Sequence, residues 1–297
     1  RGRSGLTDAQ HKDGKNARQV VRWLEEKDYG NKPFFIALGL QKPHVPFLAP
    51  DKYFDLYPFD KITYKTDRLN LWDFLPQSAL SKRYEAFGFN FAKENHALRK
   101  EYMQAYHACV SFIDAQLGLV MDSLKKQGLW EDTVIVFTSD HGYHLGDHFI
   151  WGKVTLFDIG AKVPFIVRAP GLSKSGANSE AMVELIDIYP TLIDLAGLKA
   201  PGHLQGSSLR PLLGHPERLG KKKYAYSVVT RGPKNLGYAL RNQNWRYGKW
   251  PDGEELYNLR SDPQEKNNLA QKDHVKQRIV EFRKILAEKQ ENLANTK

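Results

Sequence analysis

The stretch VIVFTSDHGYHLGDH, from Val134 to His148, joins a hydrophobic run to a loop that is crowded with ionisable side chains. The run is β-branched and aromatic, which is typical of a strand buried on both faces. The ionisable residues that follow it within nine positions are Asp140, His141, His144, Asp147 and His148. Folding does not need so many charges at one strand end, so the loop is the first candidate for a binding site.

Helix and strand patterns alternate on both sides of this stretch. Apolar residues recur at three- and four-residue steps over 98–124, which predicts a long helix that ends at Gly128. The remaining predictions are an amphipathic helix over 16–27, a buried strand over 32–40, a strand over 163–170 and a helix over 184–198. This alternation predicts an α/β fold with a mostly parallel sheet flanked by helices.

The C-terminal part follows a different pattern. Short segments with alternating faces are separated by Gly or Pro turns, and a charged helix runs from about residue 273 to the end. We therefore divide the chain into an α/β core, 1–221, and a small α+β subdomain, 222–297. In parallel sheets, ligands bind beyond the carboxyl ends of the strands. The 140–148 loop and the QKPH segment, 41–44, both follow such predicted strand ends.

Composition narrows the classes of partner. Lys and Arg exceed Asp and Glu by 44 to 34, and the net charge of +10 favours anionic partners. The basic residues are scattered and no nucleic-acid motif is present, so we expect no nucleic-acid partner. The apolar runs are too short for a transmembrane helix. The single cysteine, Cys109, excludes an internal disulfide and a Cys-based zinc site, and its apolar position in the long helix predicts a core residue.

Asp140 and His141 are adjacent where the strand turns into the loop, so a carboxylate and an imidazole can face one cation. Two ligands do not complete a coordination sphere, so others must come from elsewhere in the protein. The alternative is a solvated turn in which the aspartate precedes Gly142. Both explanations stay open on the DHG motif alone, because such short motifs also arise by chance.

Two basic segments carry the other candidate catalytic groups. QKPHVPF places Lys42 and His44 beside prolines that stiffen the backbone, and a fixed histidine can protonate a leaving oxygen. The alternative is a structural proline-rich loop. WGKVTLFD places Lys153 twelve residues after His141, where an ammonium group suits a tetrahedral oxyanion. The alternative for this residue is an ordinary surface lysine.

Taken together, these segments resemble the sulfatase family of the alkaline phosphatase superfamily. The resemblance rests on KPFFIALGLQKPHVPF (32–47), VIVFTSDHGYHLGDHFIWGKVTLFDIGAKVPFIVRAPG (134–171), ELIDIYPTLIDLAGL (184–198) and ELYNLRSDPQEKNNLA (255–270), in family order. LAPDKYFDLYP (48–58) and GYALRNQNWRYGKW (237–250) are most similar to the iduronate-2-sulfatase subgroup. The loop over about 60–96 matches that subgroup poorly and is expected to border the substrate pocket.

The resemblance implies an alkaline-phosphatase-like fold that hydrolyses sulfate esters with a formylglycine nucleophile and a divalent cation, usually calcium. It implies that Asp140 and His141 are metal ligands, that Lys153 contacts the sulfate and that His44 lies near the leaving oxygen. The other expected substrate-binding residues are Lys42, Tyr143, His144 and His148. The expected substrate is a sulfated carbohydrate, such as a sulfated uronate or a related glycan. The expected location is the periplasm or the exterior of a bacterium.

One departure from the family pattern is decisive. The formylglycine motif is Cys-x-Pro/Ala-x-Arg, whereas Cys109 opens CVSFI, and no other segment supplies the motif or the early Asp pair. We therefore expect this chain to be a C-terminal portion of a sulfatase that is inactive alone. Two alternatives remain: a metal-dependent phosphatase or phosphodiesterase of the same superfamily, and an inactive glycan-binding homologue. The sequence predicts neither the sugar nor the oligomeric state.

Overall fold

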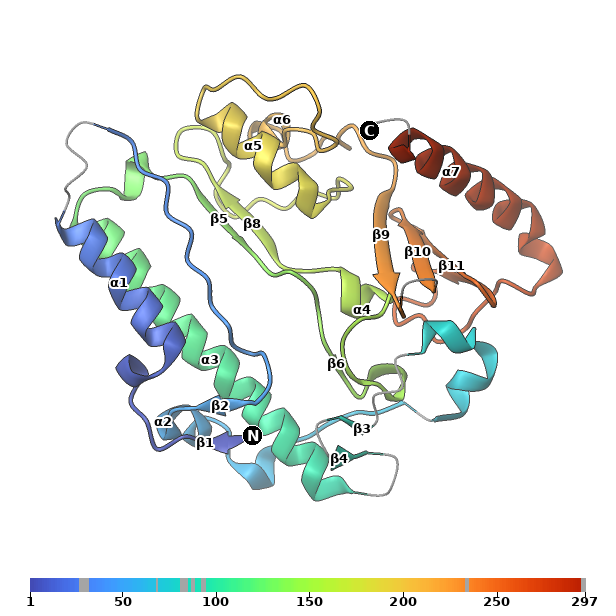
Figure 1. Ribbon diagram of the computed structural model, residues 1–297, viewed down its shortest axis with the longest axis horizontal. Coiled ribbons are helices and arrows are strands. Elements are labelled where there is room, and N and C mark those ends of the chain that lie inside the picture. The colour runs from blue at the N-terminus through green and yellow to red at the C-terminus, as the bar shows by residue number, and fades with distance from the viewer. Residues whose placement is uncertain are drawn as a thin grey trace. The chain divides into compact units, whose positions relative to one another are not determined.

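The computed structural model describes residues 1–26, 32–67, 69–80, 85–86, 89–91, 95–232 and 235–294. The chain forms two compact units (Figure 1). Unit 1 comprises Arg1–Lys65 and Asn90–Thr133, and unit 2 comprises Thr66–Phe89 and Val134–Lys297. Two short strands, β3 (Glu85–Ala86) and β4 (Phe89–Asn90), lie where the sequence passes from unit 2 back to unit 1.

Unit 1 is built on two helices that lie side by side, α1 (Lys12–Glu26) in blue and α3 (His96–Lys126) in green (Figure 1). The apolar stripe of α3 is buried, and Cys109 in its middle is fully enclosed. Gly128, at φ +70°, follows the end of α3 in a left-handed conformation that favours glycine. The long helix and its stop are thus confirmed. The other helix, α1, begins at Lys12, four residues before the start predicted at 16, and the prediction missed these residues because they are polar.

The buried strand expected over 32–40 is wrong. This segment is extended, but it pairs with no strand among the described residues, and Phe35 is 80% exposed. An apolar run becomes a buried strand only when neighbouring strands complete its ladder. Unit 1 contains instead the two-residue parallel pair β1 (Gly2–Arg3) and β2 (Leu48–Ala49), next to the short helix α2 (Asp51–Asp55).

Unit 2 contains the stretch that opens the sequence analysis. The hydrophobic run forms β5 (Ile135–Thr138), which pairs with β8 (Phe165–Arg168). This pair is antiparallel, not parallel as expected, because the connection folds back as a hairpin and one helical turn instead of a crossover helix. The connecting elements are β6 (His144–Leu145), β7 (Trp151–Gly152) and α4 (Asp158–Ala161). Two helices follow, α5 (Ile188–Leu195) and α6 (Arg210–Gly214).

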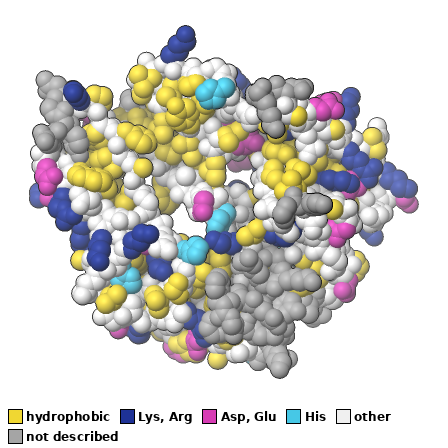
Figure 2. Space-filling view, viewed as in Figure 1, with side chains coloured by type: hydrophobic (Ala, Val, Ile, Leu, Met, Phe, Trp, Pro, Cys, Tyr) yellow, Lys and Arg dark blue, Asp and Glu magenta, His cyan; other side chains and the backbone are white. Residues whose placement is uncertain are grey.

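One face of unit 2 is strongly apolar. Figure 2 shows hydrophobic side chains gathered over α5 and the β5–β8 pair. The exposed residues include Ile166 of β8, Tyr189 of α5, and Ile186 and Leu198 on either side of α5. The sheets of α/β proteins are normally covered on both faces. These side chains therefore mark a face that the described part of the chain leaves uncovered.

The C-terminal part of unit 2 is a four-stranded antiparallel sheet covered by a helix. Its strands are β9 (Ala225–Thr230), β10 (Leu236–Arg241), β11 (Trp245–Trp250) and β12 (Gly253–Asn258), in the order β12-β11-β10-β9. Tyr247 and Leu256 of this sheet pack against Phe282 of α7 (Lys276–Ala294). An α/β chain with a C-terminal α+β subdomain is confirmed, whereas the boundary at residues 221 and 222 stays a prediction.

Candidate active site

The proposed metal ligands lie directly beyond β5. The carboxylate of Asp140 is 84% exposed, and one of its oxygens, Oδ1, accepts the backbone N–H of His141 at 3.0 Å. The other oxygen, Oδ2, lies 3.5 Å from Nε2 of His141. The two side chains that the sequence places next to each other therefore converge at one point on the surface of unit 2.

The hydrogen bonds of His141 determine which of its nitrogens faces the carboxylate. Nδ1 lies 2.9 Å from the carbonyl oxygen of Gly142, and a carbonyl can only accept, so Nδ1 carries the proton. Nε2 then faces Oδ2 of Asp140, as a lone pair in the neutral ring or as an N–H donor in the protonated ring. Two acceptors that face each other repel unless a cation or a proton lies between them. A divalent cation fits this donor set, although calcium prefers oxygen to nitrogen.

Gly142 holds this turn against the next helix. Its backbone N–H donates to the carbonyl of Gly160 in α4 at 2.9 Å. A Cβ atom at residue 142 would lie 2.0 Å from the carbonyl oxygen of Ile159, so the backbones can meet this closely only through a glycine. The position of Asp140 and His141 is therefore coupled to α4.

His144 and His148 do not line a surface pocket, which corrects the substrate contacts expected of them. Both are buried in unit 2, and His144 is 0% exposed. Its Nδ1 donates to the carbonyl of Asp147 at 3.1 Å, and its Nε2 accepts from the hydroxyl of Thr155 at 2.7 Å. The sequence pattern failed here because it shows which side chains can titrate but not which of them the loop folds inward.

The ring of His148 likewise contacts other residues of the fold. Its ring stacks on Phe157 at 3.8 Å between centroids, and its Nε2 donates to the carbonyl of Glu265 at 3.1 Å. Burial lowers the pKa of both histidines, that of His144 to about 3. A charge on His148 would further lower the pKa of His144, and the charge of Arg246 further lowers that of His148. Both rings are therefore neutral at pH 7 and belong to the support of the loop.

Tyr143 and Lys153, the other candidates in this unit, are partly buried. Lys153 follows β7 directly, between the buried pair Trp151–Gly152 and the one-turn helix α4. It is thus carried by the same loop that begins at Asp140, and its position depends on how that loop is held. The roles expected of Lys153 and Tyr143 stay predictions.

Lys42 and His44 belong to unit 1, where the QKPH segment is anchored on α1. The backbone N–H groups of Gln41 and Lys42 donate to the buried carboxylate of Asp13 at 2.8 and 2.9 Å. The ammonium of Lys42 donates to the carbonyls of His44 and Pro46 at 3.2 and 2.6 Å, so it stiffens the loop. Asp13 was missed from the sequence, because it lies 28 residues away from the segment that it holds.

The ring of His44 is exposed, and its orientation is set by one hydrogen bond. Nδ1 donates to the carbonyl of Val45 at 2.6 Å, which leaves Nε2 as the nitrogen that can exchange a proton. The proposed acid and the substrate contact of Lys42 stay predictions. The loop over about 60–96 lies partly outside the described residues.

The structure joins Asp140 directly to His141, but it shows no complete metal site. Within the described ranges, no group of three or more His, Cys, Asp or Glu side chains is arranged to hold a metal ion. Further ligands must therefore come from groups outside that set, as the sequence analysis requires of a two-residue site.

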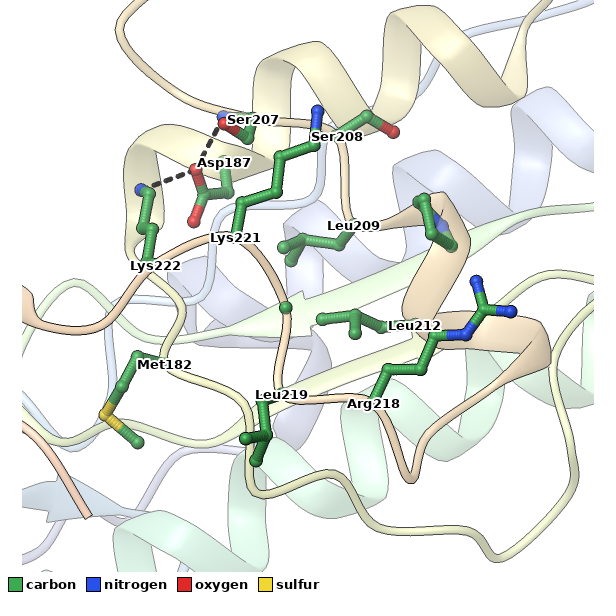
Figure 3. Close-up of a pocket in the computed structure, with 12 residues that line it drawn as sticks. Met182, Asp187, Ser207, Ser208, Leu209, Leu212, Arg218, Leu219, Lys221 and Lys222 are labelled. Atoms are coloured by element: carbon green, nitrogen blue, oxygen red, sulfur yellow. Dashed lines mark hydrogen bonds and ion pairs between the residues drawn. The ribbon is translucent and has the colours of Figure 1, made fainter.

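A cavity of about 260 Å³ in unit 2 is a separate feature, and none of the predicted site residues lines it. Figure 3 shows Asp187 on one side of it, between Ser207 and Lys222. The carboxylate of Asp187 accepts from the backbone of Ser207 at 2.8 Å and from the ammonium of Lys222 at 2.7 Å. Asp187 and Lys222 therefore neutralise each other within the chain, which favours a structural role for this ion pair, although Arg218 and Lys221 also line the cavity.

Comparison with known proteins identifies the family of the chain. The chain matches the sulfatase family over residues 3–198 and the C-terminal family of N-sulphoglucosamine sulphohydrolase over 146–292. The first match covers more than half of the chain, so the chain belongs to the sulfatase family. The family expected from the sequence is thus confirmed.

Two curated relatives illustrate the match. The chain is 38% identical over 274 residues to a sulfatase of Formosa agariphila, which covers 90% of this chain and 52% of that protein. It is 29% identical over 339 residues to human iduronate 2-sulfatase, which covers 86% of this chain and 62% of that protein. The chain therefore spans little more than half the length of these relatives.

Two solved structures confirm the alkaline-phosphatase-like fold. BT4656, solved with its substrate D-glucosamine-2-N,6-O-disulfate, has a TM-score of 0.81 at 23% identity and covers 96% of this chain and 70% of that one. The phosphonate monoester hydrolase of Agrobacterium radiobacter has a TM-score of 0.83 at 24% identity and covers 95% of this chain and 61% of that one. In the part of the chain that the structure describes, no helix is long and apolar enough to cross a bilayer.

Proposed function

We propose that the complete protein containing this chain is a sulfuric ester hydrolase that removes sulfate from a sugar. The observation that carries the proposal is the pair Asp140–His141, whose Oδ2 and Nε2 atoms face each other 3.5 Å apart beyond a strand end, in a chain of the sulfatase family. A divalent cation, calcium by family, would be held by this pair, and it would supply positive charge next to the sulfate oxygens.

Each group of this chain then has one task. The carboxylate of Asp140 balances part of the charge of the cation, and His141 supplies Nε2 with its tautomer set by Gly142. The ammonium of Lys153 stabilises negative charge on the sulfuryl oxygens in the transition state. His44 gives a proton from Nε2 to the leaving oxygen of the sugar.

The nucleophile is proposed to lie outside this chain. Cys109 does not fit a formylglycine position, because it is enclosed in α3 and burial raises the pKa of its thiol to about 12. We therefore expect the 297-residue chain alone to release no sulfate from an aryl sulfate. Metal-dependent release at rates typical of enzymes, about ten turnovers per second, would contradict this expectation.

The proposed substrate is an anionic sulfated sugar, a sulfated uronate or a related glycan unit. Three observations support it: the net charge of +10, the likeness to iduronate 2-sulfatase, and the likeness to a structure solved with a disulfated glucosamine. We propose a periplasmic or secreted location in a bacterium, where such glycans are encountered.

A second candidate is a phosphonate or phosphate monoester hydrolase. It is favoured by the likeness to the phosphonate monoester hydrolase of Agrobacterium radiobacter and by the nitrogen ligand of His141, which is common at zinc. Sulfate and phosphonate monoesters share a tetrahedral centre, so the same lysine and cation suit both.

The complete protein, including the region encoded upstream of Arg1, is assayed with sulfated uronates, sulfated glucosamines, aryl sulfates and phosphonate monoesters, at low and high salt. We expect the highest kcat/KM for a sulfated uronate, and a loss of rate at high salt, since screening weakens steering of an anion. Preference for neutral sulfated sugars would overturn the anionic sugar alone. Preference for phosphonate monoesters would overturn the sulfatase assignment, and binding without turnover would indicate an inactive glycan-binding homologue.

A further inference from the structure

A turn at the C-terminal end of the sheet reaches into the loop that carries Lys153. Glu265 lies in this turn, between β12 and α7, at φ +56° and with 2% of its surface exposed. A left-handed conformation is uncommon for a residue other than glycine, so the surrounding contacts must hold it there.

Glu265 binds the loop at two points that flank Lys153. Its carbonyl accepts from Nε2 of His148 at 3.1 Å, before the lysine in sequence. Its Oε2 accepts the backbone N–H of Asp158 at 2.6 Å, after the lysine, at the first residue of α4. One residue thus fixes both ends of the segment 148–158.

The other carboxylate oxygen of Glu265 forms a buried ion pair with Arg246 of β11, which is 1% exposed. The guanidinium also lies over the ring of Phe157, 4.9 Å from its centroid, and Phe157 in turn stacks on His148. A second buried carboxylate, Glu255 of β12, lies 3.4 Å from Arg246. The charges and the rings that hold the loop therefore form one connected group.

The same group reaches the proposed metal ligands. α4 is a single turn that starts at Asp158, and the carbonyl of Gly160 in it accepts from the backbone N–H of Gly142. Gly142 belongs to the turn that carries Asp140 and His141. Glu265 is thus linked through three residues of α4 to the metal-binding turn, and through the flanks of the loop to Lys153.

We propose that Glu265 and Arg246 are positioning residues of the candidate active site, which hold the Lys153 loop and the Asp140–His141 turn in one fixed relation. This inference rests on the proposed function for its catalytic consequence. Its structural consequence, an ordered segment 142–158, does not depend on which ester is cleaved. A shift of about 1 Å in a positioned group can cost about 100-fold in rate.

The complete protein is compared with Glu265→Gln, Glu265→Ala and Arg246→Lys. The glutamine keeps an oxygen for the N–H of Asp158 but loses the charge, whereas the alanine loses both. We expect kcat to fall about 10- to 100-fold in Glu265→Gln, with a smaller change in KM, and to fall further in Glu265→Ala. Amide hydrogen exchange over residues 142–158 is expected to accelerate in the same order.

Glu254→Gln is the matched control. Glu254 lies next to Glu255 on the same strand and pairs with an arginine, Arg283 of α7, but it does not touch the loop. We expect this variant to lower stability and to leave kcat and the exchange over 142–158 unchanged. If Glu265→Ala does not fold, Gly248→Ala reaches the same group from β11, because its Cβ would lie 2.9 Å from Oε2 of Glu255 and 3.1 Å from Nη1 of Arg246.

The outcomes separate the two proposals. A wild-type protein that cleaves a different ester, or none, contradicts the proposed function, and the exchange measurement still decides the positioning role. Glu265→Gln with a wild-type kcat and unchanged exchange over 142–158 overturns the inference. Equal effects in Glu265→Gln and Glu254→Gln would also overturn it, since they would indicate a general loss of stability.

Discussion

The turn 140–142 and the stretch 144–149 belong to one loop and share aspartate and histidine residues, yet they differ in exposure and in hydrogen bonding. Asp140 lies on the surface, and Nε2 of His141 faces it. His144 and His148 are enclosed, and carbonyls of the chain accept from one nitrogen of each ring. A cation can approach the first pair, whereas the second pair is already used by the fold.

The comparison shows that burial, and not residue type, separates a reactive group from a supporting one. A histidine that loses water without gaining a charge partner becomes neutral and acts as a polar ring in the core. A histidine with one nitrogen bound and the other exposed keeps its capacity to bind a ligand. The buried pair thus supports the loop whose exposed end is proposed to do the chemistry.

The largest effect is expected from a substitution in the exposed turn. Asp140→Ala in the complete protein removes the only carboxylate that His141 faces within the described part of the chain, so we expect loss of the bound cation and a rate loss of more than about 100-fold. Elemental analysis and kcat are measured together. Asp147→Ala is the control, because its exposed carboxylate lies in the same loop but outside the turn. Full metal occupancy in Asp140→Ala would contradict the ligand role.

The next effect concerns the lysine that the buried stretch supports. We expect Lys153→Ala to lower kcat about 100-fold and to leave metal content unchanged, because one preorganised donor is worth roughly 3 kcal/mol in a transition state. Single-turnover kinetics would locate the loss in the chemical step. An unchanged kcat/KM would contradict the catalytic role and would favour the alternative, an ordinary surface lysine.

The parts of this molecule that were predicted from sequence are those in which the signal is local. The periodicity over 98–124 indicated a helix, and the strand patterns of the C-terminal sheet needed only alternation and turns. The run 32–40 failed, because apolarity tells that a segment can be buried but not that a neighbouring strand is present. Asp140 and His141 could be paired because they are adjacent in sequence.

The support of the site could not be predicted in the same way. Glu265 lies 117 residues from His148, and no local pattern connects them. The signal was present in the segment ELYNLRSDPQEKNNLA, whose second glutamate, Glu265, stands in a turn between polar residues, but there it served only to indicate the family. A buried carboxylate in a turn becomes informative only when the three-dimensional structure shows what it binds.

The third prediction compares stability at the two positions. We expect His148→Ala to destabilise the protein by about 2 to 3 kcal/mol, because it removes the ring that stacks on Phe157 and leaves a cavity. We expect His141→Ala to change stability by less than about 0.5 kcal/mol, as is usual for surface positions. Urea unfolding of both variants checks the difference. Equal losses would mean that the exposed turn is as much a part of the core as the buried stretch.

The smallest effect is the pH dependence of stability that the buried pair imposes. Desolvation, with the nearby ring of His148, lowers the pKa of His144 to about 3, whereas a histidine in the unfolded chain titrates near 6.5. Between these values the unfolded state binds a proton that the folded state does not, so stability falls as pH falls from 6.5. The slope is at most about 1.4 kcal/mol per pH unit for one such group. Urea unfolding at pH 7.5, 6.5 and 5.5 should show a shallower slope in His144→Gln than in wild type, and no change of slope in a variant of an exposed histidine, His203→Gln. An equal slope in wild type and His144→Gln would show that His144 takes up its proton in the folded state, and the loop would then be open to water.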